Sequence, residues 1–230
     1  MCPKLSIRLT VRRGFSFLVC ALTLNLGLWQ FSIAKAPTAS KSQQNQPVSQ
    51  ELSEADKLFI ELRDAARKND VTRSGQLAAA LVNYPYTDYV RYFRIKPQLF
   101  DKGNEARADT ILDEEVYAFL RAYEGTAIAD RLRNDWLLVL GKRKDWPQFD
   151  KEYSLFMLDD DTNVKCYALQ SRLAKQEDPK RIGEDALKIM IDPRNFGSAC
   201  QELAPLLVQA KGLTISQAKA LGRAAAEMNL

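Results

Sequence analysis

Carboxylates are the side chains of this chain that could do chemistry, since the sequence contains no histidine. Ser-His-Asp and Cys-His catalysis and histidine-ligated zinc are therefore excluded. Glu114 and Glu115 could act as acid and base, but neighbouring helix residues point about 100° apart. The run Asp159-Asp160-Asp161 could bind a metal, yet neither Gly nor Glu follows at calcium-loop spacing. We expect a helix start and an interhelical turn at these positions, and no catalytic residue, metal site or cofactor.

Two tryptophans, Trp136 and Trp146, lie on either side of a Gly-Lys-Arg-Lys-Asp break. Large aromatic rings can stack on sugars, so a glycan-binding platform is one interpretation. Both rings, however, belong to apolar stripes with helical spacing, and Phe149 and Tyr153 continue the stripe of Trp146. We therefore interpret Trp136, Trp146, Phe149 and Tyr153 as residues that pack one helix against the next.

The first 34 residues have the layout of a secretory signal peptide. Lys4, Arg8, Arg12 and Arg13 precede an uncharged apolar run that ends in small residues. We expect a cleaved leader over residues 1–34 and a periplasmic protein; an uncleaved leader would instead anchor the chain in a membrane. Residues 35–50 are polar, rich in Gln and Ser, and without an apolar period, which predicts a disordered linker.

The excess of basic residues belongs to this leader. The chain has 33 basic and 29 acidic residues, and the four basic residues of the leader leave 29 of each sign in the remainder. A neutral mature chain gives no reason to expect nucleic acid as a partner.

From residue 51 onward the apolar residues recur at helical spacing, and the alternation typical of strands is missing. We predict helices over residues 52–69, 72–83, 87–100 and 105–123, and further helices that begin near residues 127, 145, 164, 179, 197 and 214. The later helix pairs repeat about every 34 residues, the period of stacked helical hairpins. The predicted fold is all-α: a curved superhelical array, or solenoid, of antiparallel helix pairs.

Local signals mark where several of these helices begin and end. Thr214 and Gln217 have the spacing of a capping box. Thr162 or Asn163 is expected to cap the helix that begins near residue 164, and Gly141 is expected to follow the last turn of the helix that begins near residue 127.

Cys166 and Cys200 are the two cysteines beyond the leader, and they lie 34 residues apart, one repeat. Equivalent places on neighbouring helix pairs and an oxidising compartment favour a disulfide between them. Two buried free thiols are the alternative, which reaction with a thiol reagent in the absence of reductant would support.

The stretch VYAFLRAYEGTAIADRLRNDWLLVLGKRKDWPQF, residues 116–149, resembles the N-terminal superhelical region of soluble lytic murein transglycosylases. The stretches KCYALQSRLA, SACQELAPLL and YPYTDYVRYFRIKPQL are similar to that region too, so the resemblance covers about residues 52–228. It implies a periplasmic protein of peptidoglycan metabolism. In that family a C-terminal lysozyme-like domain cleaves between N-acetylmuramic acid and N-acetylglucosamine, leaving a 1,6-anhydro end, and a glutamate followed by serine is its general acid and base.

This chain departs from the family because it has no Glu-Ser dipeptide. We therefore expect residues 51–230 to be a superhelical domain truncated at its C-terminal end. Such a domain would bind peptidoglycan glycan strands weakly and guide them, and it would be inactive alone, so whether the protein is an enzyme stays open. The alternative is a free-standing periplasmic helical-repeat scaffold that binds proteins. A membrane is expected as a partner only if the leader is uncleaved.

Overall fold

A computed structural model of the protein describes residues 51–190, 192 and 196–228. The expected signal peptide over residues 1–34 and the expected linker over residues 35–50 lie outside these residues. The described part contains ten α-helices and one short 3-10 turn, and its only β-type pairing is an isolated bridge between Phe100 and Ala106. The predicted all-α class is confirmed.

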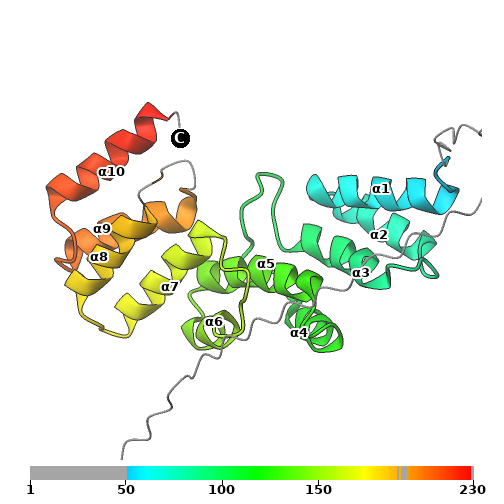
Figure 1. Ribbon diagram of the computed structural model, residues 1–230, viewed down its shortest axis with the longest axis horizontal. Coiled ribbons are helices and arrows are strands. Elements are labelled where there is room, and N and C mark those ends of the chain that lie inside the picture. Colours follow the sequence, from blue (N-terminus) through cyan, green and yellow to red (C-terminus); the bar gives the residue numbers. More distant parts are fainter. Residues whose placement is uncertain (1–50, 191, 193–195, 229–230) are drawn as a thin grey trace, which may run out of the picture. The chain divides into compact units, whose positions relative to one another are not determined.

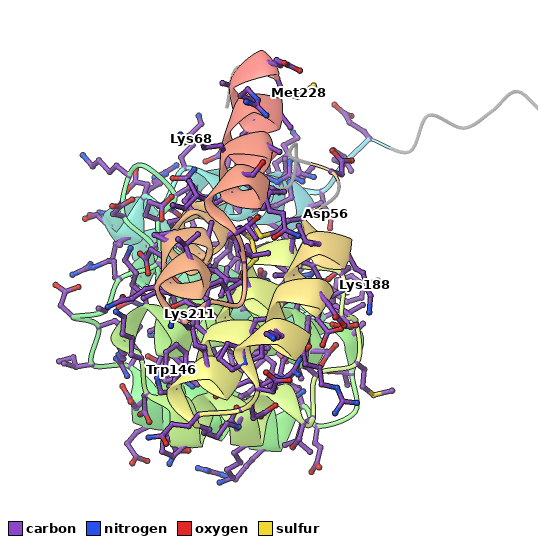
Figure 2. All side chains as sticks on the ribbon, turned by 90° about the vertical axis from the view of Figure 1, so that its left-hand side faces the viewer. Asp56, Lys68, Trp146, Lys188, Lys211 and Met228 are labelled. Carbon is purple, nitrogen blue, oxygen red and sulfur yellow. A yellow bond between two sulfur atoms is a disulfide. The ribbon has the colours of Figure 1, made fainter. Side chains whose placement is uncertain are left out.

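The helices follow the chain in close succession. They are α1 (Glu54–Arg67), α2 (Val71–Ala80), α3 (Thr87–Ile95), α4 (Asp113–Ala122), α5 (Ala127–Arg143), α6 (Trp146–Tyr153), α7 (Thr162–Ala174), α8 (Pro179–Ile189), α9 (Ser198–Gln209) and α10 (Ile215–Glu227), with η1 (Lys96–Gln98) directly after α3 (Figure 1). Helices α1, α2 and α3 pack together, α5 packs on α4, α6 and α7, and α7 also packs on α8 and α9. Helix α10 packs on α9, and Met228 caps its end (Figure 2).

Side chains just before the helices determine where several of them begin. The capping box of Thr214 and Gln217 is present at α10, as predicted. At α7 the prediction was wrong: Asp161, and neither Thr162 nor Asn163, is the N-cap, and its carboxylate accepts hydrogen bonds from the N–H groups of Asn163 (2.8 Å) and Val164 (3.2 Å). The aspartate side chain accepts hydrogen bonds from amides of the first turn that have no partner within the helix, and its negative charge interacts favourably with the positive end of the helix dipole.

The helix predicted over residues 105–123 begins later, at Asp113. The chain first makes a tight turn, in which the Asp101 carboxylate accepts a hydrogen bond from the N–H of Glu105 at 3.0 Å. Asn104 within this turn has φ 64°, a left-handed conformation that asparagine tolerates. The Asp101 side chain thus forms hydrogen bonds with nearby backbone N–H groups, and these bonds compete with helix formation at residue 105, where the helix was predicted to begin.

Buried apolar side chains form two core clusters. The smaller one lies within α1–α3 and contains Leu62, Leu77 and Val90. The larger one extends from α3 to Leu213, which directly precedes the N-cap of α10, and α5 contributes seven of its buried residues, more than any other helix. Helix α5 is therefore the central element of the described structure.

Gly141 lies inside α5, contrary to the expectation that it follows the helix end. The helix continues to Arg143 and ends at Lys144, which has the left-handed φ of 59°. A Cβ atom on Gly141 would lie 2.3 Å from the ring of Tyr167 in α7. The glycine is needed here because α5 and α7 approach each other too closely for a side chain.

Candidate functional site

The two cysteines form the predicted disulfide. Cys166 in α7 and Cys200 in α9 are bonded, with their Cα atoms 5.1 Å apart, and both side chains are fully buried. The bond links two helices that also pack on each other. It holds the fold together and offers no exposed thiol.

The four aromatic residues expected to pack helices are placed at or near the larger core. Trp136 and Phe149 are fully buried, and Trp146 and Tyr153 are partly buried and pack against the core. Trp146 lies at the side of the packed helices (Figure 2). The Trp136 and Tyr117 rings are nearly perpendicular at a centroid distance of 6.0 Å, and the Arg143 guanidinium lies over the Trp136 ring at 5.0 Å, so the ring is enclosed by protein.

Several polar residues of α5 are buried, which is unusual for charged side chains. Asp130, Arg133, Asn134 and Asp135 are 6%, 8%, 4% and 6% exposed, and they lie within the motif that carries the resemblance. Because an unpaired buried charge is costly, each of these groups needs a partner.

Arg133 is paired with two buried carboxylates. Its Nη1 lies 3.1 Å from Oδ1 of Asp130, one turn earlier in α5, and its Nε lies 3.2 Å from Oε2 of Glu152 in α6. Asp130 also accepts hydrogen bonds from the backbone N–H groups of Met157 (3.1 Å) and Leu158 (2.7 Å). These contacts fasten α5 to α6 and to the segment that follows it.

Asp135 is buried on another side of α5, where Tyr92 of α3 donates a hydrogen bond to its Oδ2 at 2.9 Å. Burial raises the pKa of Asp135 to about 6, although the positive charge of Lys96 and the Tyr92 hydroxyl act in the opposite direction. Burial and the neighbouring Asp135 likewise raise the pKa of Tyr92. A raised carboxyl pKa can mark a general acid, but this carboxylate is enclosed in the core and a substrate cannot reach it.

Asn134 completes this set of buried polar contacts. Its Nδ2 donates to Oδ2 of Asp161, the residue that caps α7, at 3.1 Å. The buried polar residues of α5 thus contact α3, α6 and the start of α7. We call Asp130, Arg133, Asn134, Asp135 and Glu152 the α5 polar network.

Other carboxylates that could do chemistry have structural roles. Glu115 lies in the first turn of α4 and forms an ion pair with Arg94. Asp159 pairs with Lys165, and Asp160 lies 3.5 Å from Arg131. Across residues 51–190, 192 and 196–228, no group of three or more His, Cys, Asp or Glu side chains is arranged to hold a metal ion. In this same part of the chain, no helix is long and apolar enough to cross a membrane.

Three of the surface hollows lie beside residues named above or on α1–α3. One, of about 390 Å³, lies beside Asp130 and Arg133 and is bordered by Met157 and Leu158. A groove of about 560 Å³ between α2 and α3 has an apolar floor and is bordered by Arg91 and Arg94. A third, of about 330 Å³, lies beside Tyr84. In the first hollow, Asp130 and Arg133 bind each other, and the remaining lining consists of Glu124, Thr126 and mainly apolar or small residues.

Comparisons with known proteins gave no match: no family model, no curated protein and no solved structure matches the chain. The resemblance therefore depends on the quoted motif residues alone. The α5 polar network gave no signal in the sequence, because its members in α5 lie off the apolar stripe, where polar side chains usually indicate a solvated face.

Proposed function

We propose that this protein is the superhelical domain of a soluble lytic murein transglycosylase. It would bind peptidoglycan glycan strands in the periplasm and guide them to a lysozyme-like domain that is not among the described residues. The observation that carries this proposal is that the stretch resembling the transglycosylase family forms two packed helices. Residues 125–149, the most specific part of the resemblance, fold as the adjacent helices α5 and α6, joined by the α5 polar network.

Repeated helix pairs support the proposed superhelix. Helices α5, α7 and α9 begin at residues 127, 162 and 198, so the interval is 35 residues and then 36. Successive first helices of these pairs pack side by side, and the disulfide joins the last two. This spacing agrees with a solenoid of antiparallel pairs with a period of about 34 residues, in which each pair covers the apolar face of its neighbour.

The role proposed for this chain is binding without chemistry. Among the described carboxylates, Asp130 and Glu152 share the guanidinium of Arg133, and Asp135 is enclosed beside Tyr92. Carboxylates enclosed in this way are not accessible to a substrate. The glycan would then contact side chains that the fold leaves exposed.

Co-sedimentation with purified murein sacculi tests this function. The protein is expressed from its full sequence and purified in the processed form that the cell makes. We expect it to sediment with the sacculi and to release no 1,6-anhydro muropeptides. If it stays in the supernatant, the binding role is wrong; if anhydro products appear, the assignment of the chemistry to another domain is wrong. N-terminal sequencing of the same preparation tests the expected removal of residues 1–34.

A free-standing protein-binding scaffold is the second candidate, and the groove between α2 and α3 favours it. Gly75, Ala78, Ala79 and Val82 supply a floor of small and apolar residues, of the kind that accommodates a partner helix. Affinity purification from the source cell distinguishes the two functions. A stoichiometric protein partner, together with the absence of murein binding, would favour the scaffold.

A further inference from the structure

Five aromatic rings make a continuous surface on α1–α3. They belong to Phe59 of α1, to Tyr84 and Tyr86 in the connection between α2 and α3, and to Tyr89 and Phe93 of α3. We call these residues the aromatic surface. The Phe59 ring stacks on Tyr84 at a centroid distance of 4.8 Å, and Tyr86, Tyr89 and Phe93 follow one another at 6.5 and 6.3 Å.

The rings differ in how far they are exposed. Phe59, Tyr84 and Phe93 are partly buried and pack against the smaller core cluster, which holds their rings in place. Tyr86 and Tyr89 are 58% and 39% exposed, although they are large aromatic side chains. Contiguous exposed apolar surface marks binding sites more often than scattered single residues do. The packed rings therefore hold two exposed rings in a defined arrangement.

Tyr84 connects these rings to a polar hollow. The hollow of about 330 Å³ has a polar part, made by Ser53, Asp56, Asn83 and Tyr84, and an apolar part, made by Ala55, Ala80, Leu81 and Pro85; the described residues that line it include no lysine or arginine. Asp56 lies near the start of α1 (Figure 2), and its Oδ1 accepts a hydrogen bond from the Tyr84 hydroxyl at 2.8 Å. The hydrogen bond from the Ser53 side chain, followed by that from Tyr84, lowers the pKa of Asp56. This carboxylate is therefore an ionised acceptor at neutral pH.

We infer that the aromatic surface and the hollow beside Tyr84 bind saccharide units of the glycan strand. This inference depends on the proposed function, because it names the surface through which the glycan would be held. A pyranose ring presents C–H groups that stack on the face of an aromatic ring, and its hydroxyls donate hydrogen bonds to carboxylate and amide oxygens. Tyr86 and Tyr89 supply exposed rings, and Asp56 and Asn83 supply the acceptors.

Charge favours a sugar over an anionic peptide at this place. A peptide rich in carboxylates would require cations, which border the groove between α2 and α3 in the form of Arg91 and Arg94. The hollow beside Tyr84 instead presents hydroxyl, amide and carboxylate groups. These groups suit an uncharged ligand with many hydroxyls.

Two substitutions at the exposed rings test the inference. The variant Tyr86→Ala/Tyr89→Ala removes both faces, whereas Tyr86→Phe/Tyr89→Phe keeps them without the hydroxyls. Ile111→Ala/Met157→Ala is the matched control, because these side chains are 93% and 84% exposed and belong to no aromatic cluster. Each protein is expressed from its full sequence. Retention on murein sacculi and binding of tetra-N-acetylchitotetraose, followed by NMR, are measured, and thermal unfolding checks the fold.

We expect the alanine variant to lose at least roughly tenfold in apparent affinity for both probes, since two stacked rings are removed. The phenylalanine variant and the control variant should bind as the unaltered protein does. Equal binding of the alanine variant and the unaltered protein to sacculi would overturn the inference and leave the proposed function intact. If the unaltered protein fails to bind sacculi, the proposed function is wrong, and chitotetraose then decides: ring-dependent binding supports a saccharide site, and absence of binding overturns it.

Discussion

Removing the Arg133 side-chain charge should destabilise the protein strongly, because two buried carboxylates depend on it. The side chains of Arg133 and Asp130 are both 9% exposed, and that of Glu152 is 6% exposed. Substitution Arg133→Met keeps an unbranched apolar chain and deletes the guanidinium. Asp130 would still accept hydrogen bonds from Met157 and Leu158, so the larger cost should fall on Glu152.

Breaking a buried ion pair by removing one partner costs about 3–5 kcal/mol, since the remaining charge stays buried and unpaired. We therefore expect Arg133→Met to lower the free energy of unfolding by about 3–5 kcal/mol. Replacing both partners by apolar residues avoids that penalty. The double variant Arg133→Met/Glu152→Leu should accordingly be more stable than Arg133→Met alone.

Urea unfolding followed by circular dichroism at pH 7 measures these free energies. The control is Arg131→Met, because the Arg131 and Asp160 side chains are 44% and 52% exposed and 3.5 Å apart. An exposed pair of this kind contributes about 0–1 kcal/mol. The reasoning would be refuted if Arg133→Met cost no more than Arg131→Met, or if the Glu152 substitution added a further loss to that of Arg133→Met.

Three further changes test other parts of the framework. The pKa of Asp135 is about 6 in the folded state against 3.8 as its ordinary value, so its contribution to stability is complete below about pH 4 and is lost as the pH rises through 6. Asp135→Asn should therefore stabilise the protein by up to about 3 kcal/mol at pH 7 and have little effect at pH 4, as measured by urea unfolding at both pH values. Replacing Cys166 and Cys200 by alanine should cost about 3–4 kcal/mol in the chain-entropy model, and dithiothreitol present during unfolding should lower the stability of the unaltered protein by a similar amount. Gly141→Ala should lower the melting temperature through a steric cost of about 1–3 kcal/mol, whereas Gly75→Ala, with open space around it inside α2, should stabilise by about 0.5–1 kcal/mol.

Helix positions were predictable where the signals are local. The box of Thr214 and Gln217 and the Pro179 start of α8 each involve residues within one turn. Prediction failed where a local alternative or a distant contact decided the outcome. The Asp101 side chain organises a turn over residues 101–105 where a helix was predicted to begin, and Gly141 provides space for Tyr167 of another helix and does not mark a helix end.

The α5 polar network could not be derived from the sequence because its partners are distant along the chain. Glu152 follows Arg133 by 19 residues, and Tyr92 precedes Asp135 by 43. Polar side chains in a helix usually indicate a solvated face, and only the packing of α3 and α6 on α5 shows that these are buried. The disulfide was predictable despite its span, since only two cysteines lie beyond residue 34, which left a single pairing.

Because the polar residues of α5 are buried, the resemblance in residues 116–149 is evidence for similar helix packing and not for a similar ligand. Asp130, Arg133 and Asp135 are engaged inside the protein, so selection on them would preserve helix pairing whatever the surface binds. A ligand can be recognised only by side chains that the fold leaves accessible. Tyr86 and Tyr89 satisfy this condition and also belong to the second stretch that carries the resemblance. We therefore expect substitution of Arg133 to lower the free energy of unfolding. Substitution of Tyr86 and Tyr89 should instead lower retention on murein and leave the stability unchanged.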